Sequence, residues 1–239
     1  MMPFGQFNDS FQFMPNILIP SLTNDLNLYL WEINEPLEWF EPQVKLTSDE
    51  DLEYSSILGK RKFEYIVQRF LLQKYLSGAN PLMKKTSNGK PFLINHNEKI
   101  SISHSKNMLL LSTASLDHGV DLEWIDKRIL RLTSKFCSIE EMKVPEGIDP
   151  VIWFTLIWSS KESLYKVDGL GQLEFRTQIA VNFTAESFNQ GWGRGIVERG
   201  DTILFFKINF SIINGFVVSW AYPAIIAKDR NAYIETDFN

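Results

Sequence analysis

The sequence has little of several features that would mark a particular class of protein. It contains a single cysteine, Cys137, in 239 residues, which excludes an internal disulfide or a site built on several cysteines and suits a reducing compartment. No apolar run approaches the roughly 20 residues of a membrane-spanning helix. The first residues lack the basic segment and cleavable apolar core of a secretion signal. We therefore expect a cytoplasmic protein that is not bound to a membrane.

An excess of positive charge is also missing. The chain has 24 Lys and Arg against 29 Asp and Glu, a net charge of −5, and a pI near 5.3. General nucleic-acid-binding proteins are usually basic, so we expect no nucleic-acid partner. The 44% apolar content is ordinary for a globular protein, and the length allows one large domain or two small halves.

The stretch that follows Asp149 has the signals of a buried helix. Asp149 is a good N-cap, Pro150 suits the first turn, and Gly169 suits the end, so we predict a helix over residues 150–168. On a helical wheel one face is apolar. That face contains Phe154, Ile157, Trp158, Leu164 and Tyr165.

Three charged residues make this helix a candidate site. Lys161 falls in the middle of the apolar face, where a lysine is costly unless an anion meets it. Glu162 and Lys166 lie on a polar stripe with Ser159. A buried helix with this arrangement of charges indicates a binding or catalytic function.

A second candidate site is the alternating stretch at residues 119–123. Val120 and Leu122 are predicted to face the core, so Asp121 and Glu123 point to the opposite side of the strand. Their Cα atoms would lie roughly 6.5–7 Å apart, close enough for both carboxylates to reach one cation. An exposed polar strand face is the alternative reading of such a pair.

The chain before these motifs is predicted to begin with strands and loops over residues 1–46. A helix starts at Ser48 with acidic residues in its first turn. Near Gly59 a second, amphipathic helix follows, and Lys60, Arg61 and Lys62 at its start have the wrong sign for a helix N-terminus. The basic residues, with Arg69 further along, form either a solvated face or an anion site. A turn at 87–91 and a hairpin of strands 100–104 and 108–113 complete this half.

After the 150–168 helix the sequence becomes strand-like. We predict strands over 178–183, 195–198, 203–213 and 216–222, with a frayed end at 228–239. Asn214-Gly215 between two apolar runs predicts a type I′ hairpin turn, which needs positive φ at both positions. Each half thus offers helix and antiparallel sheet, which is the α+β class.

Taken together, the motifs resemble those of the 4′-phosphopantetheinyl transferase superfamily in its long, surfactin-type form. The family has a Gly-(Ile or Val)-Asp-x-Glu strand, here 119–123, and a later (Phe or Trp)-(Ser, Cys or Thr)-x-Lys-Glu-(Ala or Ser)-x-x-Lys helix, here 158–166. Phe136–Glu141 is similar to the family's Phe-(Cys or Ser)-x-x-Glu stretch. The family's order is continued upstream by Gly89-Lys90-Pro91, Ser103-His104-Ser105 and the helix from Arg61 to Arg69. The resemblance covers about residues 48–170, and His118, where the family has Val or Ile, is a departure that touches packing.

The resemblance implies a fold and a reaction. The fold would be a pseudo-dimer of two similar α+β halves, each a helix packed on a small antiparallel sheet. We expect the boundary between residues 1–117 and 118–239, with coenzyme A in the cleft. The reaction would move 4′-phosphopantetheine from coenzyme A to a serine of an apo acyl- or peptidyl-carrier protein and release adenosine 3′,5′-bisphosphate. Because the chain already contains two halves, a monomer is expected.

The resemblance also implies roles for particular residues. Carboxylate oxygens suit Mg²⁺, and the implied ligands are Asp121, Glu123 and Glu162. Glu162 would also act in catalysis, with Lys161 and Lys166 on the phosphates. The adenosine and phosphate end of coenzyme A would be surrounded by Arg61, Arg69, Lys90, Ser103 and His104.

Two other functions fit the same residues. Acidic clusters with lysine also serve Mg²⁺-dependent nucleases and phosphodiesterases, although the acidic balance and the lack of a basic stripe count against a polynucleotide substrate. A catalytically silent relative that binds coenzyme A or a carrier is the non-enzymatic alternative.

Overall fold

The structure is a computed structural model that describes residues 25–227; the predictions for residues 1–24 and 228–239 lie outside this range. The first part of the chain contains β1 (Asn27–Glu32), α1 (Leu37–Phe40), the 3-10 helix η1 (Glu41–Gln43), α2 (Ser48–Ser56), α3 (Lys60–Tyr75), β2 (Met83–Lys85), β3 (Pro91–Leu93), β4 (Lys99–Ser105) and β5 (Met108–Ala114). The second part contains β6 (Gly119–Trp124), the 3-10 helix η2 (Lys127–Arg131), α4 (Thr133–Phe136), α5 (Pro150–Asp168), β7 (Ile179–Asn182), α6 (Ala185–Gln190), β8 (Trp192–Arg199), β9 (Thr202–Ile213) and β10 (Phe216–Ala227).

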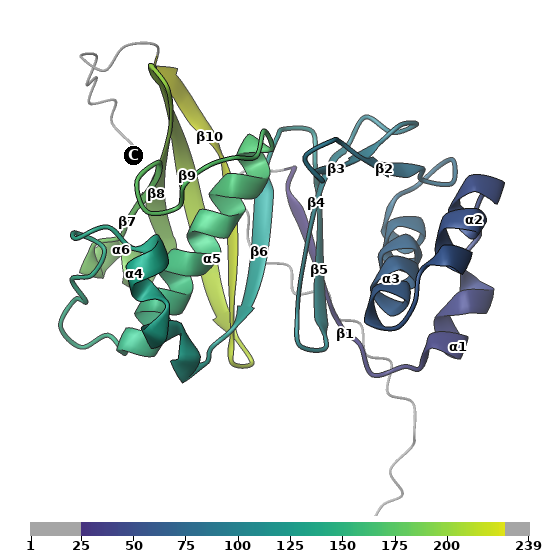
Figure 1. Ribbon diagram of the computed structural model, residues 1–239, viewed down its shortest axis with the longest axis horizontal. Helices are drawn as coiled ribbons and strands as arrows, with labels where there is room; N and C mark the ends of the chain where they lie inside the picture. The colour runs from purple at the N-terminus through teal and green to yellow at the C-terminus, as the bar shows by residue number, and fades with distance from the viewer. Residues whose placement is uncertain (1–24, 228–239) are drawn as a thin grey trace, which may run out of the picture.

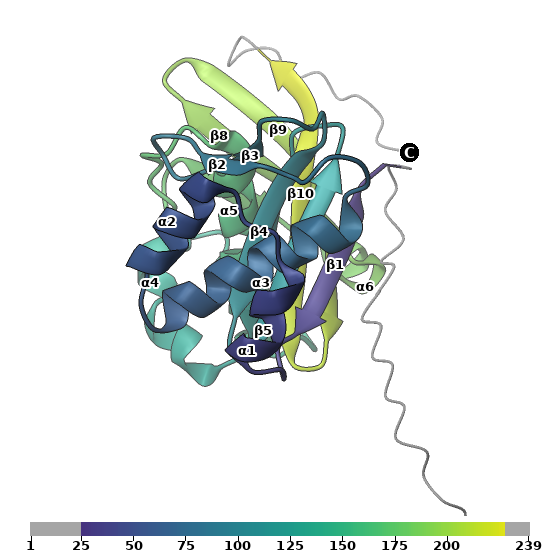
Figure 2. The same cartoon turned by 90° about the vertical axis from the view of Figure 1, so that its right-hand side faces the viewer.

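Two antiparallel sheets form the centre of the molecule. One has the strand order β1-β5-β4 and the other β6-β10-β9-β8-β7, while β2 and β3 make a separate small hairpin. In Figure 1 the sheets stand side by side between α5 and α3, and Figure 2 shows α3 lying across the three-stranded sheet. The mixed α and β composition and the antiparallel pairing are as predicted.

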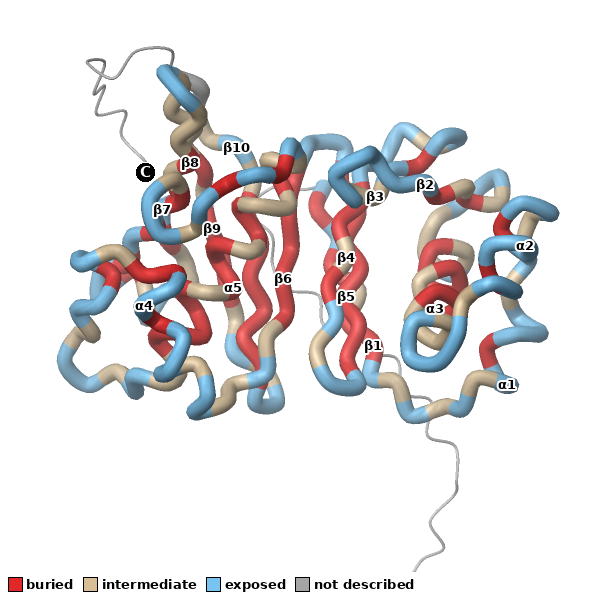
Figure 3. The backbone as a smooth tube through the Cα atoms, viewed as in Figure 1, coloured by how far each residue is buried: buried red, intermediate tan, exposed pale blue. Residues whose placement is uncertain are grey.

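Three apolar clusters hold these layers together, and Figure 3 shows the buried stretches running through both sheets. One cluster packs α3 on the three-stranded sheet, and another packs α5 on the five-stranded sheet. The third joins the inner faces of the two sheets, with Leu28 and Leu110 on one side and Val120, Leu122 and Trp220 on the other. The chain therefore builds a helix on a sheet twice, although the sheets differ in strand number. The proposed likeness of the halves and their boundary stay predictions.

The sequence predictions for the individual elements are largely confirmed. Helix α5 spans Pro150–Asp168, Asp149 accepts a hydrogen bond from the Val151 N–H, and Gly169 ends the helix with φ 67°. The β9–β10 turn has φ 50° at Asn214 and 81° at Gly215, which confirms the hairpin. No helix within residues 25–227 has the length and apolar character required to span a bilayer.

Some elements differ from prediction. Residues 37–43, expected as strand or loop, form α1 and η1, and α6 was not predicted at all. Helix α6 has only six residues and depends on the Thr184 capping box rather than on apolar periodicity. Strand β10 continues beyond Tyr222, because a bulge after Pro223 restores pairing with β9.

Helix α5 lies unusually close to β6, and small residues make this possible. A Cβ on Gly119 would clash with the Ser163 carbonyl oxygen and lie 2.6 Å from the Val167 nitrogen. On the neighbouring strand β10, the Ser219 hydroxyl lies 2.8 Å from that of Ser159 and 2.6 Å from that of Ser163. Gly119, the glycine of the acidic motif, is therefore needed for the close packing of β6 against α5.

The two sheets also meet along β4 and β6, through side chains. The Val120 N–H donates to the Ser101 hydroxyl at 3.0 Å, and the Trp124 N–H donates to the Ser105 hydroxyl at 3.1 Å. Alternate serines of β4 thus accept hydrogen bonds that a further strand would otherwise take from the outer edge of β6. This junction places Ser103, between them, beside Asp121.

We predict that Gly119→Ala destabilises the protein by about 3 kcal/mol, because the new methyl group meets helix backbone that cannot rotate away. Urea unfolding measures the change. Gly147→Ala is the control, since it has open space and incurs only the strain of φ 82°, about 1–2 kcal/mol. Equal losses in the two variants would show that α5 can move off the strand freely.

Candidate active site

Asp121 is the centre of the candidate site. Its side chain is buried, at 3% exposure, and faces α5. Its Oδ1 accepts hydrogen bonds from the Ser103 hydroxyl and from Lys166 Nζ, both at 2.8 Å. Lys166 Nζ also donates to the Ser103 hydroxyl at 2.9 Å and to the Val120 carbonyl at 3.0 Å. Strand β4, strand β6 and helix α5 thus each contribute one side chain to a compact polar cluster.

Glu123 and Glu162 extend this cluster. Burial, followed by the charge of Asp121, raises the pKa of each glutamate to about 7; Lys166 opposes the rise in both. Trp158 Nε1 donates to Glu123 Oε1 at 2.9 Å, so Glu123 faces α5 as Asp121 does. The prediction that the two acids project from the same side of the strand is confirmed.

The chemistry of this cluster fits a divalent cation. Asp121 Oδ2 is buried without a hydrogen-bond partner among the described residues, and three carboxylates repel one another beside a single lysine. A cation bound by carboxylate oxygens would relieve that repulsion, and Mg²⁺ prefers such ligands. Within residues 25–227, no group of three or more His, Cys, Asp or Glu side chains is already arranged to hold a metal. The donor atoms are therefore suitable, and the side chains would have to adjust on binding.

Lys161 does meet an anion, as predicted, but the anion belongs to the chain itself. Its side chain is fully buried, and Nζ lies 2.7 Å from Glu141 Oε2. It also donates to the carbonyl oxygens of Phe136 at 2.6 Å and Phe175 at 2.7 Å. With all these partners and no exposed surface, Lys161 points away from solvent. A contact with a substrate phosphate would require Lys161 to leave these partners, and that role stays a prediction.

Glu141 is the ion-pair partner of Lys161, and the sequence analysis assigned it no role. Besides Lys161, it accepts hydrogen bonds from the backbone N–H groups of Ser138 at 2.7 Å and Val181 at 2.9 Å. The ion pair therefore joins α5 to the segment before it and to strand β7. Its only signal in the sequence was the acidic end of the Phe136–Glu141 stretch.

The predicted phosphate-binding residues separate into two groups. The first group, Lys90 and His104, is adjacent to residues of the Asp121 cluster. Lys90 Nζ donates to the carbonyl of Val167, the residue after Lys166 in the last turn of α5, at 2.8 Å. His104 follows Ser103 on β4, and its Nε2 lies 3.1 Å from Glu64 on α3.

The arginines of α3 are placed differently. Arg69 is buried at 4% exposure, with its Nε 3.3 Å from Glu50 Oε1 and its guanidinium 3.7 Å from the Tyr65 ring centroid. It is thus part of the core beneath α2 and is not near the Asp121 cluster. Arg61 is exposed in the first turn of α3. The amphipathic pattern could not tell these two positions apart.

His118, the departure from the family pattern, is a buried packing residue. Its Nε2 lies 2.7 Å from the Ser112 hydroxyl and its Nδ1 lies 3.0 Å from the Leu116 carbonyl. Burial is the main cause that lowers the pKa of His118, so the neutral form is favoured. The prediction that it affects packing rather than the acids is confirmed.

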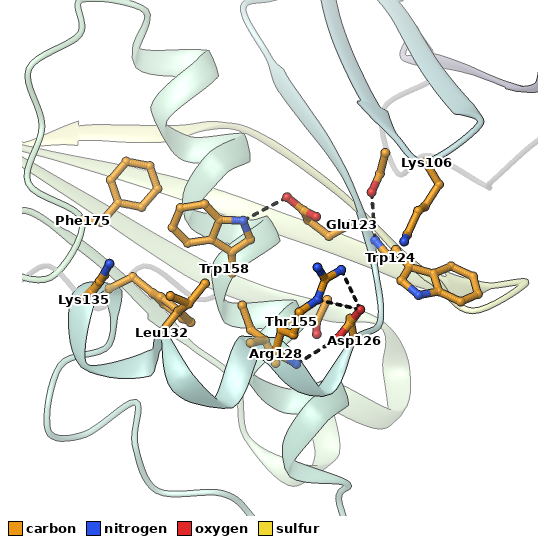
Figure 4. Close-up of a pocket in the computed structure, with 13 residues that line it drawn as sticks. Lys106, Glu123, Trp124, Asp126, Arg128, Leu132, Lys135, Thr155, Trp158 and Phe175 are labelled. Atoms are coloured by element: carbon orange, nitrogen blue, oxygen red, sulfur yellow. Dashed lines mark hydrogen bonds and ion pairs between the residues drawn. The ribbon is translucent and has the colours of Figure 1, made fainter. Parts of the chain in front are cut away.

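A cavity of about 610 Å³ opens beside Glu123, which is one of its lining residues (Figure 4). Its aromatic and aliphatic wall includes Phe136, Trp158, Phe175, Ile129 and Leu132, and its charged lining residues are Lys106, Glu123, Asp126, Arg128 and Lys135. Sequence periodicity did not reveal this cavity, because its walls come from the β4–β5 turn, β6, η2, α4, α5 and the loop after α5.

Comparison with known families agrees with this geometry. The sequence model of the 4′-phosphopantetheinyl transferase superfamily matches residues 118–221. Residues 118–221 are therefore similar to a domain of that transferase superfamily. The match contains Asp121, Glu123, Glu162 and Lys166, while Lys90, Ser103 and His104 lie before it. A search of curated proteins found no match.

We predict that Lys161→Met destabilises the protein by about 3–5 kcal/mol, because it leaves the Glu141 carboxylate buried without its cation. Denaturant titration gives the loss. Glu141→Gln introduced into Lys161→Met should recover part of it, since the change removes the buried charge and the amide oxygen can still accept one of the two backbone hydrogen bonds. Normal stability of the single variant would mean that the ion pair is dispensable.

The raised pKa values predict how stability depends on pH when no metal is present. A carboxyl with a folded pKa near 7 contributes stability that is complete below its ordinary pKa of 4.5 and is lost as pH rises through 7. In EDTA, Glu162→Gln should therefore match the wild type at pH 5 and exceed its stability at pH 8. Urea titrations at the two pH values test this, with exposed Glu146→Gln as control. An equal difference at both pH values would contradict the raised pKa.

Proposed function

We propose that this chain is a 4′-phosphopantetheinyl transferase of the long, surfactin-type form. It transfers 4′-phosphopantetheine from coenzyme A to a serine of an apo acyl- or peptidyl-carrier protein and releases adenosine 3′,5′-bisphosphate. The observation that carries the proposal is the convergence of Asp121, Glu123, Glu162 and Lys166 from the two motif elements, β6 and α5, within the matched domain.

In this proposal the three carboxylates hold Mg²⁺, which when bound neutralises charge on the diphosphate. Lys166 supplies a second positive charge beside Asp121. The serine oxygen of the carrier forms the new bond to phosphorus, and the bond from phosphorus to the departing adenosine bisphosphate breaks. Glu162 takes part in accepting the serine proton, as a positioned carboxylate can in general base catalysis.

The neighbouring groups have supporting roles in the same proposal. His104, Ser103, Lys90 and exposed Arg61 face the coenzyme A phosphates, whereas buried Arg69 contributes through the fold. Lys161 acts by holding the loops around α5, since its own partners are Glu141 and two carbonyl groups. A monomeric state and a cytoplasmic location stay predictions.

The test is to incubate the protein with coenzyme A, Mg²⁺ and an apo carrier, and then to weigh the carrier. We predict a mass gain of one phosphopantetheine, and less than about a tenth of the wild-type rate for Asp121→Ala, because phosphoryl transfer depends on charge neutralisation at this centre. Asp201→Ala, an exposed acid in the β8–β9 turn, is the control and should keep full activity.

An unmodified carrier would contradict the transferase. Binding of coenzyme A without transfer would favour the silent relative, and release of nucleotides from a polynucleotide would favour the phosphodiesterase. Full activity of Asp121→Ala would remove Asp121 from the site.

A further inference from the structure

Trp158 connects the acidic cluster to the cavity beside it. The indole Nε1 donates to Glu123 Oε1 at 2.9 Å, and the ring forms part of the cavity wall (Figure 4). One residue of α5 thus contacts a candidate metal ligand on one side and an apolar space on the other.

The Trp158 ring is held in place by two other aromatic residues. Phe175 stacks on it, with ring centroids 5.3 Å apart and planes 28° apart, and Phe136 meets it edge-on at 5.2 Å and 63°. The carbonyl groups of Phe136 and Phe175 are in turn bound by Lys161. The direction of the indole N–H is therefore fixed by packing that begins at the buried ion pair.

A fixed donor restricts a glutamate side chain that has several rotatable bonds. Glu123 is the longer of the two acids on β6, and α5 reaches it through the indole rather than through Lys166. The bond occupies Oε1 and leaves Oε2 for another partner. Hydrogen bonds of this kind to metal-binding carboxylates orient the ligand, and their removal typically weakens metal binding or activity by 10–100-fold.

We propose that Trp158 is a positioning residue that orients Glu123 for the cation, and that the aromatic stack of Phe136 and Phe175 fixes this orientation. The inference rests on the proposed function, because it requires the carboxylates to bind Mg²⁺. The transferase helix motif that 158–166 resembles has either phenylalanine or tryptophan at this position. Phenylalanine cannot donate a hydrogen bond, so the hydrogen bond to Glu123 is a feature of this chain and is not required by the motif.

The variant that tests this is Trp158→Phe, which keeps an aromatic ring between Phe136 and Phe175 and removes the N–H. Mg²⁺ binding to the whole protein, measured by isothermal calorimetry without substrates, should weaken by about 10–100-fold. In the transfer assay, the Mg²⁺ concentration for half-maximal rate should rise by a similar factor, and saturating Mg²⁺ should restore much of the rate.

Trp153→Phe is a matched control from the same helix. Trp153 is buried, whereas Trp158 is partly buried, and Trp153 Nε1 donates to the Glu141 carbonyl at 3.0 Å, so this variant loses a comparable hydrogen bond that does not involve a candidate ligand. It should lose stability without a change in Mg²⁺ affinity. Phe175→Leu, which loosens the stack but leaves the indole, should weaken Mg²⁺ binding by less than Trp158→Phe does, and it provides the test if Trp158→Phe does not fold.

The outcomes separate this inference from the function on which it rests. Wild-type binding of Mg²⁺ that Asp121→Ala abolishes, together with equal binding by folded Trp158→Phe, would overturn the inference and leave the transferase standing. An unchanged affinity in Phe175→Leu would overturn the role of the stack. A wild-type protein that binds no Mg²⁺ would overturn the metal site and the inference together.

Discussion

The close contact between helix α5 and strand β6 is the constraint on which the rest of the structure depends. At Gly119 there is no room for even a methyl group between the strand and the backbone of the helix. Hydroxyl groups of Ser159, Ser163 and Ser219 fill the neighbouring space and bond to one another. This contact brings Lys166 within 2.8 Å of Asp121, so the packing of small residues determines the position of the large charged ones.

Helix α5 also shows how two lysines of one helix can have opposite tasks. Lys161 is neutralised internally by Glu141, and burial is the main cause that lowers its pKa while Glu141 opposes the effect. Lys166, five residues later, faces a cluster with more negative charge than it can balance. The first lysine closes a structural network, whereas the second belongs to a site whose excess of carboxylates favours an additional cation.

The parts of the fold that depend on local signals could be predicted from the sequence. Helix caps at Asp149 and Gly169 and the turn at Asn214-Gly215 are determined by residues a few positions apart, and the structure agrees with them. The alternation at Val120 and Asp121 likewise predicted that Asp121 and Glu123 project from the same side of the strand. Spacing within one element was therefore sufficient to find the core of the candidate site.

What could not be predicted depends on residues distant in sequence. Glu50 neutralises Arg69 and Glu141 neutralises Lys161, so two cations that looked available for phosphate are bound inside the protein. Neither partner can be recognised without the tertiary fold, because many acids in the sequence were equally suitable. The cavity beside Trp158 was missed for the same reason, since segments distant from one another in the sequence enclose it.

The serines of β4 have a consequence for the behaviour of the protein at high concentration. Strand β6 is the outermost strand of its sheet, and outermost strands with free N–H groups are templates on which another chain can add a strand. Here the hydroxyl groups of Ser101 and Ser105 cover two of those N–H groups without forming a continuous eight-stranded sheet. The junction between the sheets therefore also reduces the tendency of β6 to pair with a strand of another molecule and to aggregate.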